Sequence, residues 1–269
     1  MLGSIIGDMV GSRFEFNNHR STQFELLTDQ CSYTDDTVMT VAVADALLNH
    51  KPMGTTMQEY GRRYPNPMGG YGGRFAIWLH RSDAEPYNSF GNGSGMRMSP
   101  CALLAHGSRE KALSQAAISA MPTHNHPEGV KGAMAIADAI MMAFDHVGKE
   151  EMRYSLSRLY GYSLDFTCES IRNTNCFNET CMVTVPQAIV AFLDAHSFEE
   201  TLRLAVSIGG DSDTLAAMAG GIAEAYYGIP DDIIQKSLPL LPPAFIEILK
   251  RAYEQSEAES SKAVLRWLV

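Results

Sequence analysis

The chain has 269 residues, 45% of them hydrophobic, and carries a formal net charge of −10. This length allows one large hydrophobic core or two small ones, while the acidic charge and the lack of a basic stripe disfavour a surface for nucleic acid or for an anionic membrane. The apolar runs are too short and too polar to span a bilayer, and the apolar start of the chain, residues 1–11, carries Asp8 and no basic region, unlike a signal peptide.

Periodicity typical of helices dominates the chain, and no convincing alternating strand pattern is present. The expected helices cover residues 3–10, 37–49, 56–64, 72–79, 99–105, 108–121, 127–146, 150–159, 184–193, 199–208, 215–227, 231–236 and 243–258. Pro122 and the glycine- and proline-rich residues 65–73 mark loops. Because neither a low-complexity linker nor an internal repeat interrupts this series, the sequence predicts a single compact all-α domain over residues 1–269.

The first expected helix carries Gly3, Gly7 and Gly11 on one face, one every four residues. A glycine inside a helix costs about 1 kcal/mol relative to alanine, so the stripe indicates that another backbone packs closely against it. Asp8 lies next to the stripe and is either a group that supports a nearby site or an ordinary surface or capping aspartate. Glu15 follows this helix, and a lone glutamate acquires a role only if the fold brings it to other functional groups.

Two acidic clusters stand directly before expected helices. The first is Tyr33-Thr34-Asp35-Asp36-Thr37, and the second is Gly209-Gly210-Asp211-Ser212-Asp213-Thr214. One Asp, Ser or Thr suffices to cap a helix, and adjacent carboxylates repel each other unless a cation lies between them. Hard oxygen donors at this density suit Mg²⁺, Mn²⁺ or Ca²⁺. The clusters therefore predict either the halves of a two-metal centre, with four carboxylates balancing two divalent cations, or two capped helices that never meet.

Two further loops carry polar groups suited to a phosphate ligand. Residues 88–95, with the sequence NSFGNGSG, expose backbone N–H groups that can cradle a phosphate, although they match neither the Walker A nor the dinucleotide fingerprint. An ordinary flexible loop is the alternative. His124 and His126 form an HxH pair, but no further Cys or His cluster completes a zinc or copper site. A histidine that binds a ligand phosphate or caps the next helix is the more economical interpretation.

Taken in order, these segments resemble the ADP-ribosylglycohydrolase family, whose founding bacterial members reactivate ADP-ribosylated dinitrogenase reductase. The resemblance rests on residues 3–11 (GSIIGDMVG), 34–37 (TDDT), 91–97 (GNGSGMR), 123–124 (TH) and 209–214 (GGDSDT). Five ordered motifs that run almost the length of the chain are much more specific than any one of them. The resemblance implies a single compact orthogonal all-α domain around a binuclear centre of two Mg²⁺ ions, or of Mn²⁺.

The resemblance also implies roles for individual residues. The implied metal ligands are Thr34, Asp35, Asp36, Asp211, Asp213 and Thr214. The implied catalytic residues are Glu15, Asp35 and Asp213, with Glu15 in the place of a glutamate that gates the cleft or acts as acid and base. The implied ligand-binding residues are Asn88, Ser89, Phe90, Gly91, Asn92 and Gly93, which match the loop for the diphosphate and ribose, and His124. Cys176 and Phe177 lie where the family places its adenine-side loop, but many relatives have a glycine–aromatic pair there, so this match is loose.

The function implied by the resemblance is hydrolysis of the bond at C1″ of an ADP-ribosyl group on a protein side chain or small acceptor. The metals would bind the distal ribose and a water, and Glu15 or a metal-bound aspartate would handle the proton. One alternative is a non-catalytic ADP-ribose-binding relative. The other is a metal-dependent phosphohydrolase, because residues 211–214 superficially resemble the DxDT motif of haloacid dehalogenases. That motif should follow an apolar strand near the start of a domain, whereas here it follows a diglycine late in the chain.

The expected partner is an ADP-ribosylated protein or an ADP-ribose derivative. The sequence leaves the acceptor open between arginine, serine, threonine, nucleic acid and O-acetyl groups, of which nucleic acid is disfavoured by the acidic charge. The five cysteines are odd in number and form no CxxC pair, which favours reduced thiols in a cytoplasmic protein. We expect a monomer with no membrane association.

Overall fold

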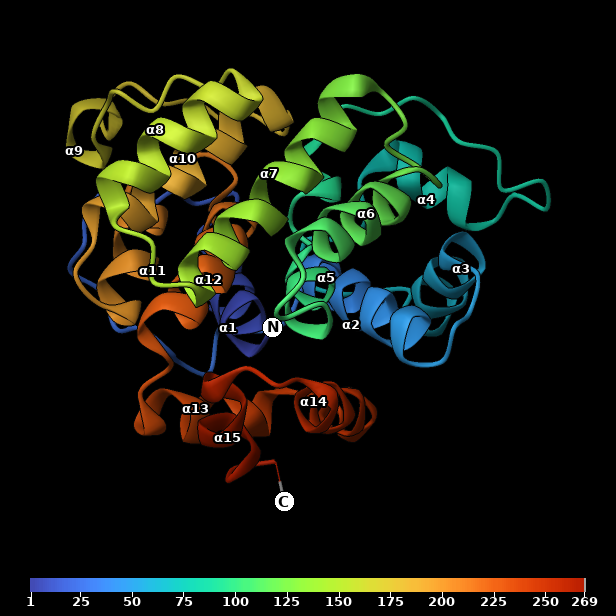
Figure 1. Cartoon of the computed structure of the whole chain (residues 1–269). Helices are drawn as coiled ribbons and strands as arrows, with labels where there is room; N and C mark the ends of the chain where they lie inside the picture. Colours follow the sequence, from blue (N-terminus) through green and yellow to red (C-terminus); the bar gives the residue numbers. More distant parts are fainter. Residues whose placement is uncertain (269) are drawn as a thin grey trace.

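The computed structural model describes residues 1–268 as a series of helices joined by loops (Figure 1). The helices are α1 (Leu2–Ser12), α2 (Asp35–Leu48), α3 (Met53–Arg63), α4 (Gly73–Leu79), η1 (Asn92–Ser94), α5 (Ser99–Leu104), α6 (Arg109–Ala120), α7 (Pro127–Phe144), α8 (Lys149–Tyr160), α9 (Cys168–Ile171), α10 (Cys181–Asp194), α11 (Phe198–Ser207), α12 (Ser212–Tyr227), α13 (Asp231–Ser237), η2 (Leu238–Leu240), α14 (Pro243–Gln255) and α15 (Glu259–Leu265). Within the described residues the only β-type pairings are two isolated bridges, Thr34–Met68 and Gly91–Thr180. The expected all-α fold is confirmed.

Every helix expected from the sequence is present, with ends that differ by a few residues. Helix α10 begins earlier than expected, at Cys181, so that Pro186 lies inside the helix rather than near its start, where proline is best tolerated. The sequence missed α9, a single turn closed by a capping box between Thr167 and Ser170. It also missed α15, because the expected last helix ran on to residue 258, whereas α14 ends at Gln255 and a new helix begins at Glu259.

Helices α1 and α12 occupy the centre of the molecule, although they come from distant parts of the chain (Figure 1). They pack along each other more extensively than any other pair, and every residue of α1 is buried. A Cβ atom on Gly7 would lie 2.0 Å from the carbonyl oxygen of Ala216, and one on Gly11 would lie 2.4 Å from Cα of Asp213. The glycine stripe therefore serves a backbone-to-backbone contact, as the sequence indicated, and this contact places α1 against the first turn of α12.

The other helices surround this central pair. Helices α2 to α6 lie on one side and α8 to α11 on the other, α7 runs between the two groups, and α13 to α15 form a layer below them (Figure 1). Helix α14 packs beneath α2 and buries Phe245 and Tyr253 completely. None of the described helices combines the length and the apolar character needed to cross a bilayer.

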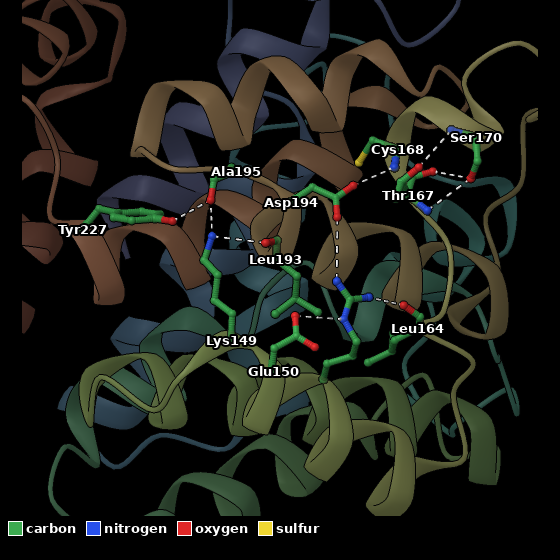
Figure 2. A network of polar contacts seen from close by, with 11 residues as sticks. Lys149, Glu150, Leu164, Thr167, Cys168, Ser170, Leu193, Asp194, Ala195 and Tyr227 are labelled. Carbon is green, nitrogen blue, oxygen red and sulfur yellow. Dashed lines mark hydrogen bonds and ion pairs between the residues drawn. The ribbon is translucent and has the colours of Figure 1, made fainter.

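A polar seam fastens α8 to the carboxyl end of α10 (Figure 2). Lys149 donates to the carbonyl oxygens of Leu193, at 3.2 Å, and of Ala195. Arg153 lies 3.8 Å from the carboxylate of Asp194. Cations at the end of a helix stabilise its unpaired carbonyl groups. These contacts of Lys149 and Arg153 therefore attach α8 to the carboxyl end of α10. The amino end of α10 contacts the glycine loop of residues 88–95 through the Gly91–Thr180 bridge.

Candidate functional site

A cavity of about 430 Å³ lies where α2 and α12 begin. Its lining combines aspartates of the two acidic clusters with Glu15, Phe16, residues 69–75, Ser89, residues 91–93, Phe177 and Glu179. The clusters touch, because the hydroxyl of Thr214 donates a hydrogen bond to Oδ1 of Asp36 at 3.3 Å. The alternative in which two capped helices never meet is therefore wrong. Asp35, Asp36, Asp211, Asp213 and Thr214 all line the cavity, whereas Thr34 lies behind them.

Only one of the two clusters supplies a side-chain helix cap. Thr34 is the N-cap of α2, and its hydroxyl oxygen accepts from the backbone N–H of Asp36 at 3.2 Å. Asp211 is the N-cap of α12, but its side chain accepts no capping hydrogen bond from a backbone N–H of the helix. The Asp211 carboxylate instead accepts from the side-chain amide of Asn92 at 2.7 Å. The second cluster is therefore directed towards the cavity rather than towards its own helix.

The Asp8 carboxylate binds two threonines of the first cluster, Thr34 and Thr37, through hydrogen bonds. Its Oδ1 accepts from the hydroxyl of Thr34 at 2.7 Å, and its Oδ2 accepts from the backbone N–H of Thr34 at 3.0 Å and of Thr37 at 3.1 Å. The Thr37 hydroxyl also donates to Oδ2, at 2.5 Å. Asp8 is fully buried, and burial raises its pKa to about 6 although these hydrogen bonds oppose the change. Asp8 is therefore a supporting group for the site and not a surface charge.

The carboxylates at the cavity are crowded and incompletely paired. Glu15, Asp211 and Asp213 each offer an oxygen atom within 4.8 Å of the others. Oδ2 of Asp36 and Oδ1 of Asp213 are buried without a hydrogen-bond partner among the described residues. Burial raises the pKa of Asp36 and Asp213 well above its usual range, and neighbouring carboxylates raise it further. Because unpaired buried anions are costly, this set of hard oxygen donors fits a divalent cation.

Glu15 approaches the cluster from the loop that follows α1. A Cβ atom on Gly69 would lie 2.5 Å from Oε2 of Glu15, and Gly69 has a left-handed φ of 76°. The left-handed backbone conformation therefore favours glycine at position 69, and the absence of a side chain there leaves room for the Glu15 carboxyl group. Burial, followed by the charge of Asp211, raises the pKa of Glu15 to about 7. A carboxyl group with this pKa exchanges protons readily near neutral pH.

The glycine loop forms a further part of the cavity lining, next to the second acidic cluster. Ser89, Gly91, Asn92 and Gly93 line the cavity, while Phe90 lines a shallower neighbouring one of about 310 Å³. The hydroxyl oxygen of Ser89 accepts from the N–H of Gly91 at 3.1 Å. These contacts, together with the Asn92–Asp211 bond, show an anchored segment rather than an ordinary flexible loop.

Asn88 lies outside both cavity linings. Its φ is 54°, a left-handed value that asparagine tolerates better than most residues, and its N–H donates to the side chain of Asn125 at 2.8 Å. The structure therefore places Asn88 at the turn that leads into the loop rather than on the cavity wall.

The two histidines of the HxH pair have different roles. His126 caps a helix, and His124 lines the cavity. His126 is the N-cap of α7, and its Nδ1 accepts from the N–H of Glu128 at 3.1 Å. His124 lines the cavity, and its Nδ1 lies 2.7 Å from the hydroxyl of Thr123, which accepts from Arg97 at 3.0 Å. The hydrogen bond between Thr123 and Nδ1 anchors the ring and leaves Nε2 of His124 outside this contact.

The charge state of His124 follows from its surroundings. Burial, followed by the positive charge of Arg97, lowers the pKa of His124 well below its usual value. The ring is therefore neutral. A Cβ atom on Gly93 would lie 3.2 Å from Nε2, so this nitrogen faces the glycine loop.

Phe177 and Cys176 differ in their relation to the cavity. Phe177 lines it and stacks on Phe16, with ring centroids 6.2 Å apart and planes inclined by 25°. Cys176 is exposed and lies outside the lining.

Sequence reasoning missed the lining residues Phe16, Tyr71, Tyr87, Arg97 and Glu179. The glycine-rich residues 69–73 carried a signal, but the sequence marked them only as a loop.

Because its carboxylates are crowded, the metal-free protein is expected to be more stable at acidic pH than at neutral pH. The pKa values of Asp8 (about 6) and Glu15 (about 7) are raised by burial in the folded state. Raised carboxyl pKa values mean that the folded chain binds more protons than the unfolded one, so stability is greatest below the ordinary pKa and falls as pH rises to about 7. Thermal unfolding in EDTA should therefore occur at a higher temperature at about pH 5 than at about pH 7.5.

Saturating Mg²⁺ supplies the control for this prediction. A bound cation favours the charged carboxylates, so the difference between the two pH values should shrink. A metal-free protein that is more stable at the higher pH would contradict the argument from buried charge.

Comparison with known proteins identifies the family. A sequence model described as ADP-ribosylglycohydrolase matches residues 1–261. The chain is 28% identical to ADP-ribosylhydrolase ARH3 of Mus musculus, over 85% of this chain and 83% of that protein. It is 25% identical to ADP-ribosyl-[dinitrogen reductase] glycohydrolase of Rhodospirillum rubrum, over 86% of this chain and 85% of that protein.

A further relative and a solved structure agree with this assignment. The ADP-ribosylarginine hydrolase Tri1 of Pseudomonas putida is 25% identical, over 92% of this chain and 72% of that protein. A solved structure of an ADP-ribosylglycohydrolase-related protein complex superimposes with a TM-score of 0.66 and 25% identity, covering 100% of this chain and 96% of that one. The chain therefore belongs to the ADP-ribosylglycohydrolase family of hydrolases.

Proposed function

We propose that this protein hydrolyses the glycosidic bond at C1″ of an ADP-ribosyl group and that two divalent cations, Mg²⁺ or Mn²⁺, assist the reaction. One observation carries the proposal: carboxylates from the starts of α2 and α12 converge on a cavity that the glycine loop and His124 also line. Acidic groups suit cations and sugar hydroxyls, whereas the glycine loop suits phosphates. A cavity of about 430 Å³ has the size of a small-molecule site.

The residues that would hold the cations are Asp35, Asp36, Asp211, Asp213 and Thr214, with Thr34 behind them. Support comes from the unpaired buried oxygens of Asp36 and Asp213. The hydroxyl of Thr34 already donates to Asp8 and accepts from Asp36, so it has one lone pair left for a cation. When bound, such cations polarise sugar hydroxyls and lower the pKa of a water molecule.

The remaining cavity residues would bind and orient the nucleotide. The bare backbone at Gly91 and Gly93 leaves space beside His124, whose Nε2 would donate to a phosphate oxygen in the tautomer that is protonated there. The ring of Phe177 offers a face for a planar base, and the carboxylates of the acidic wall accept hydrogen bonds from the distal ribose. Together these groups would place C1″ of that ribose beside Glu15.

Glu15 is the proposed acid and base. Its carboxyl lies within 4.8 Å of Asp211 and Asp213, which would place it to transfer a proton next to the cation-binding carboxylates. The transition state would have oxocarbenium character, as in other glycoside hydrolysis. Asp35 and Asp213 are the alternative residues for the proton transfer.

A panel of ADP-ribosylated substrates with arginine, serine and O-acetyl linkages tests this function. Release of free ADP-ribose from at least one of them is expected, with loss in EDTA and recovery on addition of Mg²⁺ or Mn²⁺. Binding of ADP-ribose without turnover of any linkage would instead indicate a non-catalytic relative. Phosphate release from a generic phosphomonoester, without action on ADP-ribosyl bonds, would indicate a phosphohydrolase.

We further propose that the protein is a cytoplasmic monomer. Its cysteines are free thiols, and all but Cys176 are buried. Reduced thiols are the rule in the cytoplasm. Sedimentation analysis of the purified protein checks the oligomeric state.

A further inference from the structure

Glu15 lies in the loop after α1, outside any helix or strand, and the side chain of Asn18 hydrogen-bonds to the backbone of this loop. Nδ2 of Asn18 donates to the carbonyl oxygens of Phe14 at 2.8 Å, of Glu15 at 3.0 Å and of Gly210 at 2.9 Å. Oδ1 of Asn18 accepts from the N–H of Gly210 at 2.8 Å. Since an amide has two N–H protons, one of them is shared between two carbonyls. Every polar atom of this side chain is therefore used.

The partner of Asn18 is the turn that precedes the second acidic cluster. Gly209 and Gly210 have φ values of 70° and 86°, in the left-handed region that favours glycine. Two left-handed residues in succession turn the backbone just before Asp211. Asn18 binds both the N–H and the carbonyl of Gly210, so it fixes the orientation of this turn at two points.

Two other side chains also bind the backbone next to this turn. Asn175 donates to the carbonyl oxygen of Gly209 at 3.1 Å, and Arg20 donates to that of Ile208 at 3.0 Å. Asn18 differs from both because it also contacts the carbonyl of Glu15 itself. A single amide thus joins the backbone of Glu15 to the backbone next to Asp211.

We propose that Asn18 is a positioning residue that sets the distance between Glu15 and the carboxylates of the α12 cluster. This inference rests on the proposed function, in which Glu15 transfers the proton. Without the Asn18 amide, the loop after α1 loses its hydrogen-bonded attachment to Gly210, and Glu15 moves relative to Asp211. Catalytic groups that shift by about 1 Å can lose a hundredfold in rate.

The kinetic test compares Asn18→Ala and Asn18→Asp with the matched changes Asn17→Ala and Asn17→Asp. Asn17 is the adjacent residue, is exposed, and makes no hydrogen bond within residues 1–268. Both Asn18 variants should lower kcat by about tenfold to a hundredfold with little change in KM, whereas both Asn17 variants should match the wild type. Asn18→Asp should not rescue activity, because a carboxylate cannot donate to the three carbonyls. Full activity in either Asn18 variant overturns the proposal.

A double-mutant cycle with Glu15→Gln distinguishes positioning from a general structural role. If Asn18 acts through Glu15, Asn18→Ala should lose most of its effect on kcat in the Glu15→Gln background. An equal reduction in both backgrounds overturns the proposal, because it shows that Asn18 acts independently of Glu15.

Hydrogen exchange provides a readout that does not depend on turnover. In Asn18→Ala, amide exchange should accelerate in residues 14–18 and 209–211 while α7 remains protected as in the wild type. Unchanged exchange in both segments overturns the proposal. If the wild type releases ADP-ribose from no substrate, the proposed function fails, but the exchange result still decides whether Asn18 holds the Glu15 segment.

Discussion

Asp213→Asn is expected to abolish ADP-ribose release and, at the same time, to stabilise the metal-free protein. Asp213 is 3% exposed, and its Oδ1 is buried without a partner. Asparagine keeps the shape of the side chain but removes the charge that a cation requires. Removing a residue that hydrogen-bonds to a metal ligand already lowers metal affinity or activity by about 10–100-fold. Removing a ligand itself should therefore lower the rate of turnover by about a thousandfold or more.

The gain in stability follows from the same residue. Burial, together with the neighbouring charges of Asp211 and Asp36, raises the pKa of Asp213 well above its usual range. At neutral pH a charged Asp213 therefore opposes folding, and the neutral asparagine removes that penalty. The variant should unfold at a higher temperature than the wild type in EDTA, and the order should reverse when Mg²⁺ saturates the wild type.

Three measurements check this expectation: turnover at saturating Mg²⁺, calorimetric titration with Mn²⁺, and thermal unfolding in EDTA. Asp29→Asn is the matched control, because Asp29 is an exposed aspartate outside the cavity lining. Retained turnover with an unchanged Mn²⁺ stoichiometry contradicts the binuclear assignment. A lower unfolding temperature in EDTA contradicts the argument from crowded carboxylates.

Gly7→Ala is expected to destabilise the protein more than any change confined to a surface helix. The added Cβ atom would lie 2.0 Å from the carbonyl oxygen of Ala216, which is main chain and cannot rotate away. The helices must separate, and the free energy of unfolding should fall by about 3 kcal/mol, the upper end of typical overpacking costs. The opposing gain in helix propensity is only about 1 kcal/mol.

Urea denaturation measures this change. Gly148→Ala is the control, since Gly148 has open space around its Cα and a φ of −59°, and the change there should stay below about 1 kcal/mol. Activity should fall in Gly7→Ala even where the protein remains folded, because α1 carries Asp8 and α12 carries Asp213. Equal stability of Gly7→Ala and wild type would show that α1 and α12 are not in main-chain contact.

The sequence predicted the helices and the acidic clusters well because both produce local signals. The glycine stripe of α1 predicted a close backbone contact, and Gly7 makes one with α12. Adjacent carboxylates are equally visible, so the residue pattern alone singles out Asp36 and Asp213 as candidate ligands. What the residues alone could not decide is which oxygen faces the cavity and which caps a helix.

Residues that act through long-range contacts were harder to find. Thr34 and Asp211 both occupy N-cap positions, yet only Thr34 caps with its side chain. The difference arises from Asn92, which is distant from Asp211 in sequence and binds its carboxylate. Asn18 gave no local signal at all, because its bonds to Gly210 form only when the chain folds.

The acidic clusters and the glycine loop line the same cavity, and under the proposed function this proximity couples the binding of cation and nucleotide. A diphosphate that enters beside Asp35, Asp36, Asp211 and Asp213 meets repulsion from like charges unless cations arrive first. Cation and nucleotide should therefore bind with positive cooperativity. Since such linkage is reciprocal, ADP-ribose must tighten cation binding by the same factor by which the cation tightens ADP-ribose binding. Scarce divalent cation would then be retained mainly by protein molecules that already hold the nucleotide.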